Sequence, residues 1–261
     1  MELELKGKRA FVGGASAGLG AAAAMELVAE GAEVTICSRS QENLRETADT
    51  ILAATGRKPS ILAADLSQSS DLDGLCKEFE RLNIDILVSN GGGPPAGQFC
   101  DLKPEAWDHA ADLLLRPAVR LTRAVIGGMV ERKFGRLIYI TSIAVLQPVD
   151  NLILSNTYRA GVTAFCKTVS NTHARYGITA NCVCPGYTAT ERLTALAEQM
   201  AKAENTTVEA IMERFAASTS AKRVGRPEEL AALIAFLASD KAAYITGCSI
   251  PVDGGANKAL V

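Results

Sequence analysis

The chain has 261 residues, of which 48% are apolar and 21% are charged, and its formal net charge is −2. These values exclude a fibrous or intrinsically disordered chain, and they fit one large α/β domain with a substantial core. Lysine and arginine are dispersed along the chain, so no basic stripe of the kind that binds nucleic acid is present.

The sequence predicts neither a membrane segment nor an export signal. Its first eleven residues lack the charged-then-apolar pattern of a signal peptide, and no apolar run approaches the roughly 18 residues of a membrane span. Seven cysteines are scattered without a CxxC pair, which favours reduced, buried thiols in a cytoplasmic protein. With only two histidines, both in helical patterns, we expect no metal site.

Short apolar runs alternate with longer helical patterns along the chain. The runs, each predicted to be a strand, are residues 9–13, 33–37, 60–64, 84–89, 136–141, 179–184 and 248–252. The helical patterns cover residues 21–30, 42–54, 71–82, 104–132, 155–176 and 227–238. Most runs are apolar on both faces, as in a parallel sheet covered by helices. The alternation predicts an α/β fold with one Rossmann-type, doubly wound parallel sheet of about seven strands and helices on both faces.

One segment, residues 187–226, intervenes between the sixth strand and the last helix. It contains two amphipathic helical stretches, residues 191–203 and 207–218. Their apolar side chains recur at helical spacing: Leu193, Leu196, Met200, Ile211, Met212 and Phe215. Inserted helices beside a ligand crevice often form a lid, and a packed surface excursion gives the same pattern, so both interpretations stay open. No linker or repeat divides the chain, and we expect residues 1–261 to form a single domain.

The first strand leads into a glycine-rich turn that opens an alanine-rich helix. Glycines permit a tight turn and let a pyrophosphate approach backbone N–H groups, to which the helix N-terminus adds positive potential. A strand before the pattern and a helix after it are the context that a dinucleotide site requires. The residues predicted to bind the dinucleotide here are Gly14, Ser16, Gly18, Leu19 and Gly20.

The end of the second strand indicates which dinucleotide is bound. Enzymes specific for NAD often place a carboxylate there for the ribose 2′-hydroxyl, whereas this chain has Ser38 and Arg39. A hydroxyl and a guanidinium suit a 2′-phosphate, although a solvated arginine at a strand end is the alternative. The sequence therefore favours NADP(H) over NAD(H).

Motifs in order along nearly the whole chain resemble the short-chain dehydrogenase/reductase family, in particular its 3-oxoacyl-ACP reductase-like members. They are the GxxxGxG spacing of residues 14–20, Asn90 with Gly92, Ser142, residues 244–247 and residues 252–255. The resemblance implies that Asp65 and Leu66 lie beside the adenine and that Asn90 braces the sheet edge under the cofactor. It also implies cofactor contacts from the segment after the sixth strand: Pro185, Gly186, Thr188 and Thr190.

The chain departs from this family at the catalytic positions. The family uses a Ser that holds the carbonyl, a Tyr that transfers the proton, a Lys that binds the nicotinamide ribose and an Asn that holds a water. Aligned on Ser142 and on the motifs that follow, the Asn, Tyr and Lys positions are Leu114, Ser155 and Arg159. The family's Thr before the first motif glycine is Gly13 here.

These substitutions keep the cation at the cofactor and weaken proton transfer. An aliphatic hydroxyl such as that of Ser155 is a much weaker acid than a phenol of pKa about 10. Arg159 can bind ribose hydroxyls, but it stays protonated and shuttles no proton. Tyr187 is a candidate substitute donor, with lid packing as an equal alternative, whereas helix packing is favoured for Tyr158. The candidate catalytic residues are therefore Ser142, Ser155, Arg159 and Tyr187.

Three functions remain open. The favoured one is an NADP-dependent oxidoreductase that transfers a hydride to or from a carbonyl or alcohol substrate. The loss of Tyr, Lys and Asn leaves an NADP-binding pseudoenzyme or partner subunit as the alternative, and the arginine at 159 leaves non-redox, dehalogenase-like chemistry as a minor one. We expect a small-molecule substrate, of lipophilic character if the apolar residues of segment 187–226 face it. From the resemblance we expect a homotetramer or a dimer.

Overall fold

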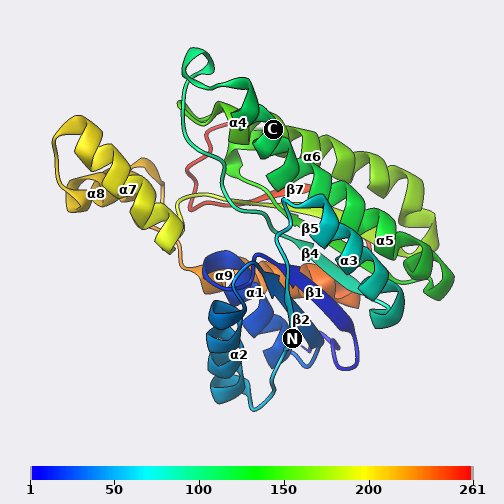
Figure 1. The fold of residues 1–261 in the computed structure, drawn as a ribbon. Coiled ribbons are helices and arrows are strands. Elements are labelled where there is room, and N and C mark those ends of the chain that lie inside the picture. The colour runs from blue at the N-terminus through cyan, green and yellow to red at the C-terminus, as the bar shows by residue number, and fades with distance from the viewer. Residues whose placement is uncertain (1, 260–261) are drawn as a thin grey trace.

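The computed structural model describes residues 2–259, and at its centre is a seven-stranded sheet in the order β3-β2-β1-β4-β5-β6-β7 (Figure 1). Every neighbouring pair of strands is parallel. The strands are β1 (Arg9–Gly13), β2 (Glu33–Ser38), β3 (Ser60–Ala63), β4 (Ile86–Ser89), β5 (Gly135–Ile140), β6 (Ile178–Pro185) and β7 (Ser249–Val252). Chain order reverses between β1 and β4, which places a crevice at the carboxyl ends of these two strands. The predicted doubly wound sheet is confirmed.

Helices cover both faces of the sheet (Figure 1). On one face pack α1 (Gly18–Ala29), α2 (Gln41–Thr55) and α9 (Pro227–Ala238), and on the other α3 (Ser69–Leu82), α5 (Arg116–Arg132) and α6 (Ile153–His173). Alternate residues of β1 enter the two cores, Ala10 and Val12 on the first face and Phe11 on the second. A strand between two helical layers has no solvent-facing side, which explains why these runs are apolar throughout.

The helix predicted over residues 104–132 is divided into three parts. It consists of α4 (Pro104–Ala110), a π-helical turn (Ala111–Leu115) and α5. Pro117 lacks the N–H that an α-helix needs at this point, so the backbone widens by a turn before the helix resumes. The turn brings the carbonyl of Leu113 against the loop after β4, only 2.6 Å from where a Cβ on Gly91 would lie.

The segment between β6 and α9 contains two further helices, α7 (Glu191–Glu204) and α8 (Val208–Ser218), which project from the body of the molecule (Figure 1). The hydroxyls of Thr190 and Thr207 accept hydrogen bonds from backbone N–H groups and cap the two helices. The helices pack on one another around a small core that includes Ile211 and Phe215. Most of the apolar residues named from the sequence are therefore used in packing within this segment.

The two ends of the α7–α8 segment leave the body side by side. The N–H of Gly225 donates to the carbonyl of Tyr187 at 2.9 Å, and the N–H of Ala189 donates to the carbonyl of Gly225 at 2.8 Å. This reciprocal pair joins residues that are far apart in the sequence. The two ends of the segment are thus held together at one base. Further contacts to the body come from Ala221, whose N–H donates to the carbonyl of Gly254 at 2.9 Å, and from the side chain of Arg192.

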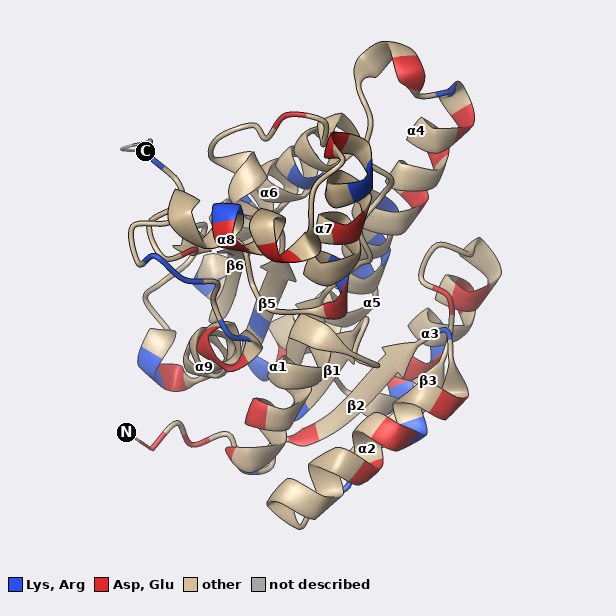
Figure 2. Ribbon diagram, turned by 90° about the vertical axis from the view of Figure 1, so that its left-hand side faces the viewer, with Lys and Arg blue, Asp and Glu red and all other residues tan. Residues whose placement is uncertain are grey.

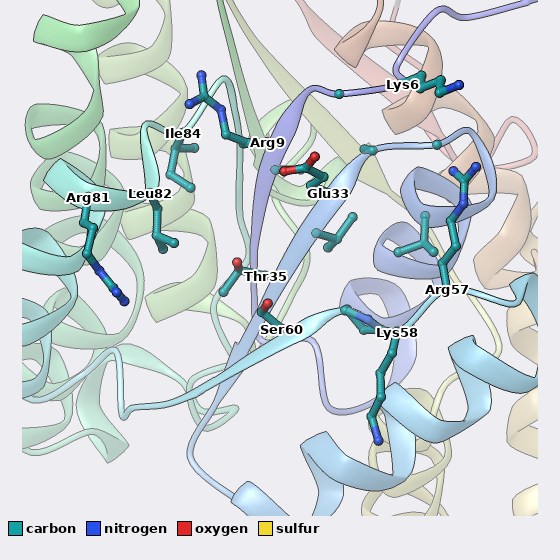
Figure 3. Close-up of a pocket in the computed structure, with 17 residues that line it drawn as sticks. Lys6, Arg9, Glu33, Thr35, Arg57, Lys58, Ser60, Arg81, Leu82 and Ile84 are labelled. Carbon is teal, nitrogen blue, oxygen red and sulfur yellow. The ribbon is translucent and has the colours of Figure 1, made fainter.

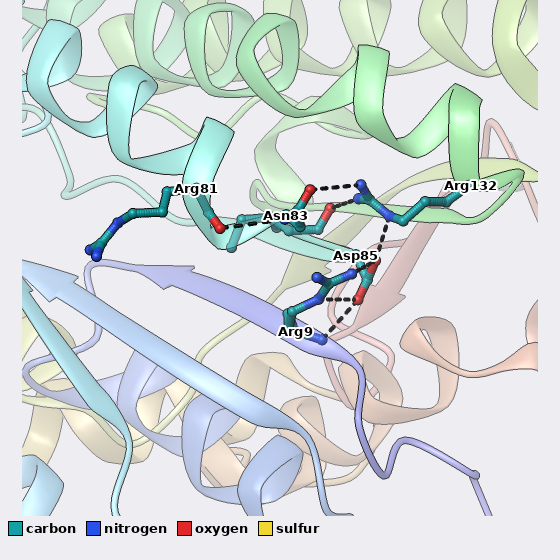
Figure 4. A network of polar contacts seen from close by, with 6 residues as sticks. Arg9, Arg81, Asn83, Asp85 and Arg132 are labelled. Atoms are coloured by element: carbon teal, nitrogen blue, oxygen red, sulfur yellow. Dashed lines mark hydrogen bonds and ion pairs between the residues drawn. The ribbon is translucent and has the colours of Figure 1, made fainter.

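Charged side chains form a network at the amino ends of the central strands (Figure 4). Asp85, which is 5% exposed, accepts hydrogen bonds from the guanidinium groups of Arg9 and Arg132, both at 3.0 Å. Burial alone raises the pKa of Asp85, but the hydrogen bonds and charge of Arg9 and the charge of Arg132 hold it below its ordinary value. The network fixes the start of β4 between β1 and α5.

Charges elsewhere are mixed. Figure 2 shows lysine and arginine interspersed with acidic residues over the helices of one side, with no stripe of one sign. Within residues 2–259, no helix has the length and apolarity needed to cross a bilayer. The seven cysteines carry free thiols, and no cluster of three or more potential metal ligands occurs in the part of the chain that the structure describes.

Candidate active site

A cavity of about 520 Å³ lies at the carboxyl ends of β1, β4, β5 and β6 (hereafter the site cavity). Its wall is built from the turn after β1, the loops after β4 and β5, α6, the segment after β6 and the start of α7. This is the switch-point position at which open parallel sheets bind ligands. The fold thus brings segments from both halves of the chain to one crevice.

A second cavity, of about 670 Å³, lies at the opposite, amino end of the sheet (Figure 3). The basic side chains in its wall are spread around the rim rather than converging. Three of them, Arg9, Lys58 and Arg81, form ion pairs with Asp85, Asp49 and Glu78. The cavity contains none of the residues that the sequence predicts for the site, so its larger volume does not make it the functional crevice.

The glycine-rich turn has the geometry that an anion needs. Gly14 has φ 58°, and a Cβ there would lie 2.8 Å from the side-chain nitrogen of Asn90, while a Cβ on Gly20 would lie 2.2 Å from the carbonyl of Gly14. Asn90 donates to that carbonyl at 3.2 Å and so braces the turn. No side chain caps α1, which begins at Gly18 and has no acidic residue in its first turn. Its first N–H groups therefore face the crevice and fit a pyrophosphate.

The other predicted cofactor residues lie along the edge of the crevice on the side of β2 and β3. Arg39 lines the site cavity and makes no ion pair within the described structure, whereas Ser38, Ser16 and Gly20 lie beside its wall. Asp65 accepts hydrogen bonds from the N–H and hydroxyl of Ser67 at 2.9 and 2.8 Å. Leu66 is buried directly beneath Gly13: a Cβ on that glycine would lie 3.1 Å from its side chain.

Ser155 and Arg159 form a hydrogen-bonded pair one helical turn apart on α6. Nε of Arg159 donates to the hydroxyl oxygen of Ser155 at 3.2 Å. Nη1 donates to the carbonyls of Ile140 and Thr141, both at 2.9 Å, and Nη2 donates to the carbonyl of Gly92 at 3.3 Å. The guanidinium is therefore fixed between the ends of β4 and β5, with its plane set by carbonyl oxygens.

The charge of Arg159 has no carboxylate partner. Desolvation by burial, followed by the positive charge of Arg192, lowers the pKa of Arg159 to about 10. No ion pair involving Arg159 occurs within residues 2–259. At neutral pH the group is still protonated, and its charge is directed at the cavity rather than cancelled within the protein.

Ser142 lines the same cavity as this pair. It caps the short helix Ile143–Val145, and its hydroxyl oxygen accepts the N–H of Ala144 at 3.1 Å. Ser142 and Ser155 both line the site cavity, and Ser155 is 9% exposed. Two hydroxyls whose oxygens already accept N–H groups are thus presented to the same space.

The two tyrosines differ in position. Tyr187 lines the site cavity, but its ring is stacked on Phe215, with centroids 4.5 Å apart, and burial raises the pKa of its phenol. Tyr158 is outside the cavity wall and packs against Trp107 at 6.3 Å. Leu114 is 6% exposed and lies beside Gly91. The position at which the resemblance expects an amide is therefore apolar.

The structure adds wall residues that the sequence did not single out. Val149, Leu152 and Arg192 line the site cavity together with Leu193 and Leu196. Arg192 is the second residue of α7. Its only sequence signal was a cation in the first turn of a helix, where acidic residues are preferred. Which way α7 faces decides the role of Arg192, and the sequence does not contain that information.

Comparison with known proteins agrees with this geometry. A protein-family model described as enoyl-(acyl carrier protein) reductase matches residues 14–257. The chain therefore belongs to the short-chain dehydrogenase/reductase family, whose members are oxidoreductases.

Individual relatives resemble the chain over its full length. The 3-oxoacyl-(acyl-carrier-protein) reductase of Synechocystis is 34% identical over 251 residues, which are 94% of this chain and 95% of the relative. The NADPH-dependent reductase BacG of Bacillus subtilis is 32% identical over 260 residues, 97% and 99% of the two chains. The structure of L-sorbose reductase from Gluconobacter frateurii with NADPH and L-sorbose has a TM-score of 0.94 and 30% identity, and each chain is covered completely. NADP(H) is therefore favoured as the cofactor, as the sequence predicted.

Proposed function

We propose that this chain is an NADPH-dependent carbonyl reductase that holds the substrate carbonyl with two serine hydroxyls, Ser142 and Ser155. The observation that carries the proposal is the pair formed by Ser155 and Arg159, 3.2 Å apart at the cavity wall. Because each serine oxygen already accepts an N–H, its own hydrogen is free to donate to the carbonyl oxygen. Two donors aimed at developing negative charge form an oxyanion hole, without a phenol.

The proton comes from Ser155 and is replaced from water. As the carbonyl carbon is reduced, the new alkoxide takes the Ser155 hydroxyl proton, and the serine oxygen regains one from solvent. Arg159 keeps its own proton because its pKa stays near 10, and it stabilises the serine oxygen through the Nε hydrogen bond during the exchange. With the apolar Leu114 in place of an amide, solvent enters through the open cavity rather than through a relay behind Arg159.

The chain's own residues account for cofactor binding. The first N–H groups of α1 and the turn at Gly14 hold the pyrophosphate, and Arg39 with Ser38 holds the 2′-phosphate. Arg159, Pro185, Gly186, Thr188 and Thr190 would hold the nicotinamide half, and Asp65 and Leu66 would border the adenine. Bound in this way, the nicotinamide supplies the hydride.

The α7–α8 segment acts as a lid in this proposal. Its base is a short hydrogen-bonded pair of backbone segments, and its first turn lines the cavity. Tyr187 stands at the base of the lid, where it is a second candidate proton donor. Its stacking on Phe215 supports a packing role, so we expect it to shape the cavity wall.

Removal of each hydroxyl tests the proposal. We expect Ser142→Ala and Ser155→Ala each to lower kcat by about 10²–10³-fold, the usual effect of losing one oxyanion-hole donor. NADPH affinity, measured by fluorescence titration, should stay unchanged. Tyr158→Phe is the matched control, because it removes a hydroxyl from the same helix outside the cavity. Full activity in Ser155→Ala with loss of activity in Tyr187→Phe would instead make Tyr187 the donor.

A broad assay separates the reductase from its main alternative. Purified protein with NADPH should turn over at least one member of a panel of ketones, quinones and acyl-thioesters. Tight NADPH binding with no turnover across that panel would contradict the proposal and support an NADP-binding pseudoenzyme or partner subunit. Halide release from a halohydrin without nucleotide would support the dehalogenase-like alternative.

We also propose a cytoplasmic homotetramer, with a dimer as the smaller alternative. The support is the family resemblance, in which α5, α6 and the last strand form the subunit contacts, and the seven free thiols, which suit a reducing compartment. Light scattering tests the assembly, and a monomer at micromolar concentration would contradict it.

A further inference from the structure

The first turn of the lid directs a cation across the site cavity. Nη2 of Arg192, on α7, donates to the carbonyl of Pro94 in the loop after β4 at 3.0 Å. Gly93 makes room for it, since a Cβ there would lie 2.6 Å from Nη2 and 2.8 Å from the guanidinium carbon. The guanidinium therefore lies flat against a loop that has no side chain at the point of contact.

Arg192 is exposed, and most of its N–H groups are open to solvent or to a ligand. An arginine has five N–H hydrogens in a planar fork, and one of them reaches Pro94. No carboxylate forms an ion pair with it within residues 2–259, although Glu191, the only acidic residue in the cavity wall, is its neighbour in the chain. The remaining N–H groups match the geometry of a carboxylate.

A second unpaired guanidinium lies close by. Arg159 bonds to the carbonyl of Gly92, two residues before the carbonyl that Arg192 uses, so the two accepting carbonyls are at most about 7 Å apart along the backbone. The charge of Arg192 is a cause of the lowered pKa of Arg159. Two like charges facing one cavity are unfavourable, and an anion between them relieves that repulsion.

A set of apolar side chains in the cavity wall comes from the loop after β4, the loop before α6, the segment after β6 and α7 itself. These residues, which we call the substrate end, are Pro94, Val149, Leu152, Tyr187, Leu193 and Leu196. The cofactor's own phosphates have other partners in the proposed function: the first turn of α1 and Arg39. The cation and the apolar wall together suit a molecule with one anionic group and an apolar remainder.

We propose that Arg192 binds a carboxylate of the substrate, so that the enzyme reduces oxo acids rather than neutral ketones. This inference rests on the proposed function and names its substrate class. With the carbonyl held by Ser142 and Ser155, a carboxylate a few bonds away reaches Arg192 when the lid covers the cavity. Arg192 is thus a specificity-determining residue, carried to the site by the lid.

The test compares acids with their methyl esters at three spacings between the two groups. Pyruvate, acetoacetate and levulinate place the carboxylate one, two and three carbons from the carbonyl carbon. For the preferred spacing we expect kcat/KM for the acid to exceed that for the ester by at least about tenfold. Arg192→Gln should lower kcat/KM for that acid by about 10–100-fold and leave the ester unchanged, as expected for a charged hydrogen bond.

Two controls make the result specific. Lys202→Gln removes a cation from the same helix outside the cavity wall and should change nothing. Gly93→Ala keeps every charge but displaces the guanidinium of Arg192, and it should reproduce part of the loss. Equal losses for acid and ester, or no preference for acids in the unmodified protein, would overturn the proposal.

Binding measurements distinguish a carboxylate contact of Arg192 from failure of the reductase proposal and from a contact of Arg192 with the cofactor's phosphates. Calorimetric titration of the NADP⁺ complex with each acid and ester reports the carboxylate contact even if no turnover occurs, so failure of the reductase proposal is seen separately. A weaker Kd for NADPH in Arg192→Gln, with acids and esters bound alike, would assign the residue to the cofactor's phosphates and overturn the substrate role.

Discussion

At the amino ends of the strands Arg136 is 2% exposed and donates to the carbonyls of Gly135, Gly177 and Ser239 and to the carboxylate of Asp240. At the carboxyl ends Arg159 is held almost identically by carbonyls, but a serine hydroxyl stands where Asp240 stands for Arg136. The two guanidiniums thus differ chiefly in whether the protein neutralises them.

This difference separates scaffold from site. A buried guanidinium that is paired with a carboxylate contributes a fixed junction and little external field. One that is satisfied only by carbonyls keeps its full charge for a ligand. The same contrast holds for the surrounding groups: Arg9 and Arg132 share Asp85, whereas Arg39 and Arg192 have no acidic partner in the described structure.

Removal of the unpaired cation of Arg159 should impair catalysis more than any other change at the site. Arg159→Met should lower kcat by about 10³-fold or more, because the cation at Ser155 and the cofactor's ribose contact are lost together. Steady-state kinetics with NADPH measures this. Arg159→Lys should recover part of the activity, since the charge stays while the fork is lost. If Arg159→Met were as active as the unmodified enzyme, the unpaired charge of Arg159 would have no role in catalysis.

Arg136, the paired cation, should matter for stability and not for catalysis. Arg136→Met should lower the free energy of unfolding by about 3 kcal/mol, because three buried carbonyls lose their donor. Chemical denaturation measures the loss. The kcat of the folded enzyme should be unchanged, and a tenfold fall in kcat at full folding would show that the amino end is coupled to the chemistry.

The carboxylate of Asp85 should make the stability of the protein depend on acid pH. The pKa of Asp85 is held below its ordinary value, so its interactions stabilise the protein above about pH 4 and are lost as pH falls through the folded-state pKa. Asp85→Asn should cost about 2 kcal/mol at neutral pH and less as the pH falls below about 4. Denaturant midpoints at several pH values test this, and a constant difference between the two proteins would refute it.

The rate of the proposed reaction should not depend on pH in the weakly alkaline range. No group assigned to proton transfer changes charge between about pH 7 and 9, because the pKa of Arg159 is about 10 and that of Tyr187 lies above its ordinary value. A plot of log kcat against pH should be flat there, with an inflection near pH 10. An inflection within the flat range would indicate a proton donor outside the Ser155 pair.

The sheet was predictable because its signal is local. Buried parallel strands need apolar residues on both faces, and the runs at residues 33–37 and 136–141 satisfy this without reference to the rest of the chain. The glycine turn is likewise a local pattern, since Gly14 and Gly20 are required by their own backbone and by its immediate neighbours. The interruption of the helix 104–132 by a π-helical turn before Pro117 was not predicted.

The substrate end was not predictable in the same way. Leu193 and Leu196 appeared in the sequence as apolar positions of an amphipathic helix, and only the packing of α7 on α8 shows that they reach the cavity while Phe215 does not. The role of Arg192 depends on which way α7 faces, because this helix projects from the body of the molecule. The proposed catalytic pair was predictable in part. Spacing singled out Ser155 and Arg159, but the carbonyl contacts that orient Arg159 come from β5 and the loop after β4.

The base of the lid allows the α7–α8 segment to be exchanged during evolution. Residues 189 and 225 are joined by a backbone hydrogen bond, and the helices between them have their own core. A segment with adjacent ends and an independent interior is exchangeable as a unit. If the proposed function is right, replacing this segment with the corresponding segment of a relative should change substrate preference and leave NADPH binding intact, and substrate range could change in evolution while the cofactor site is kept.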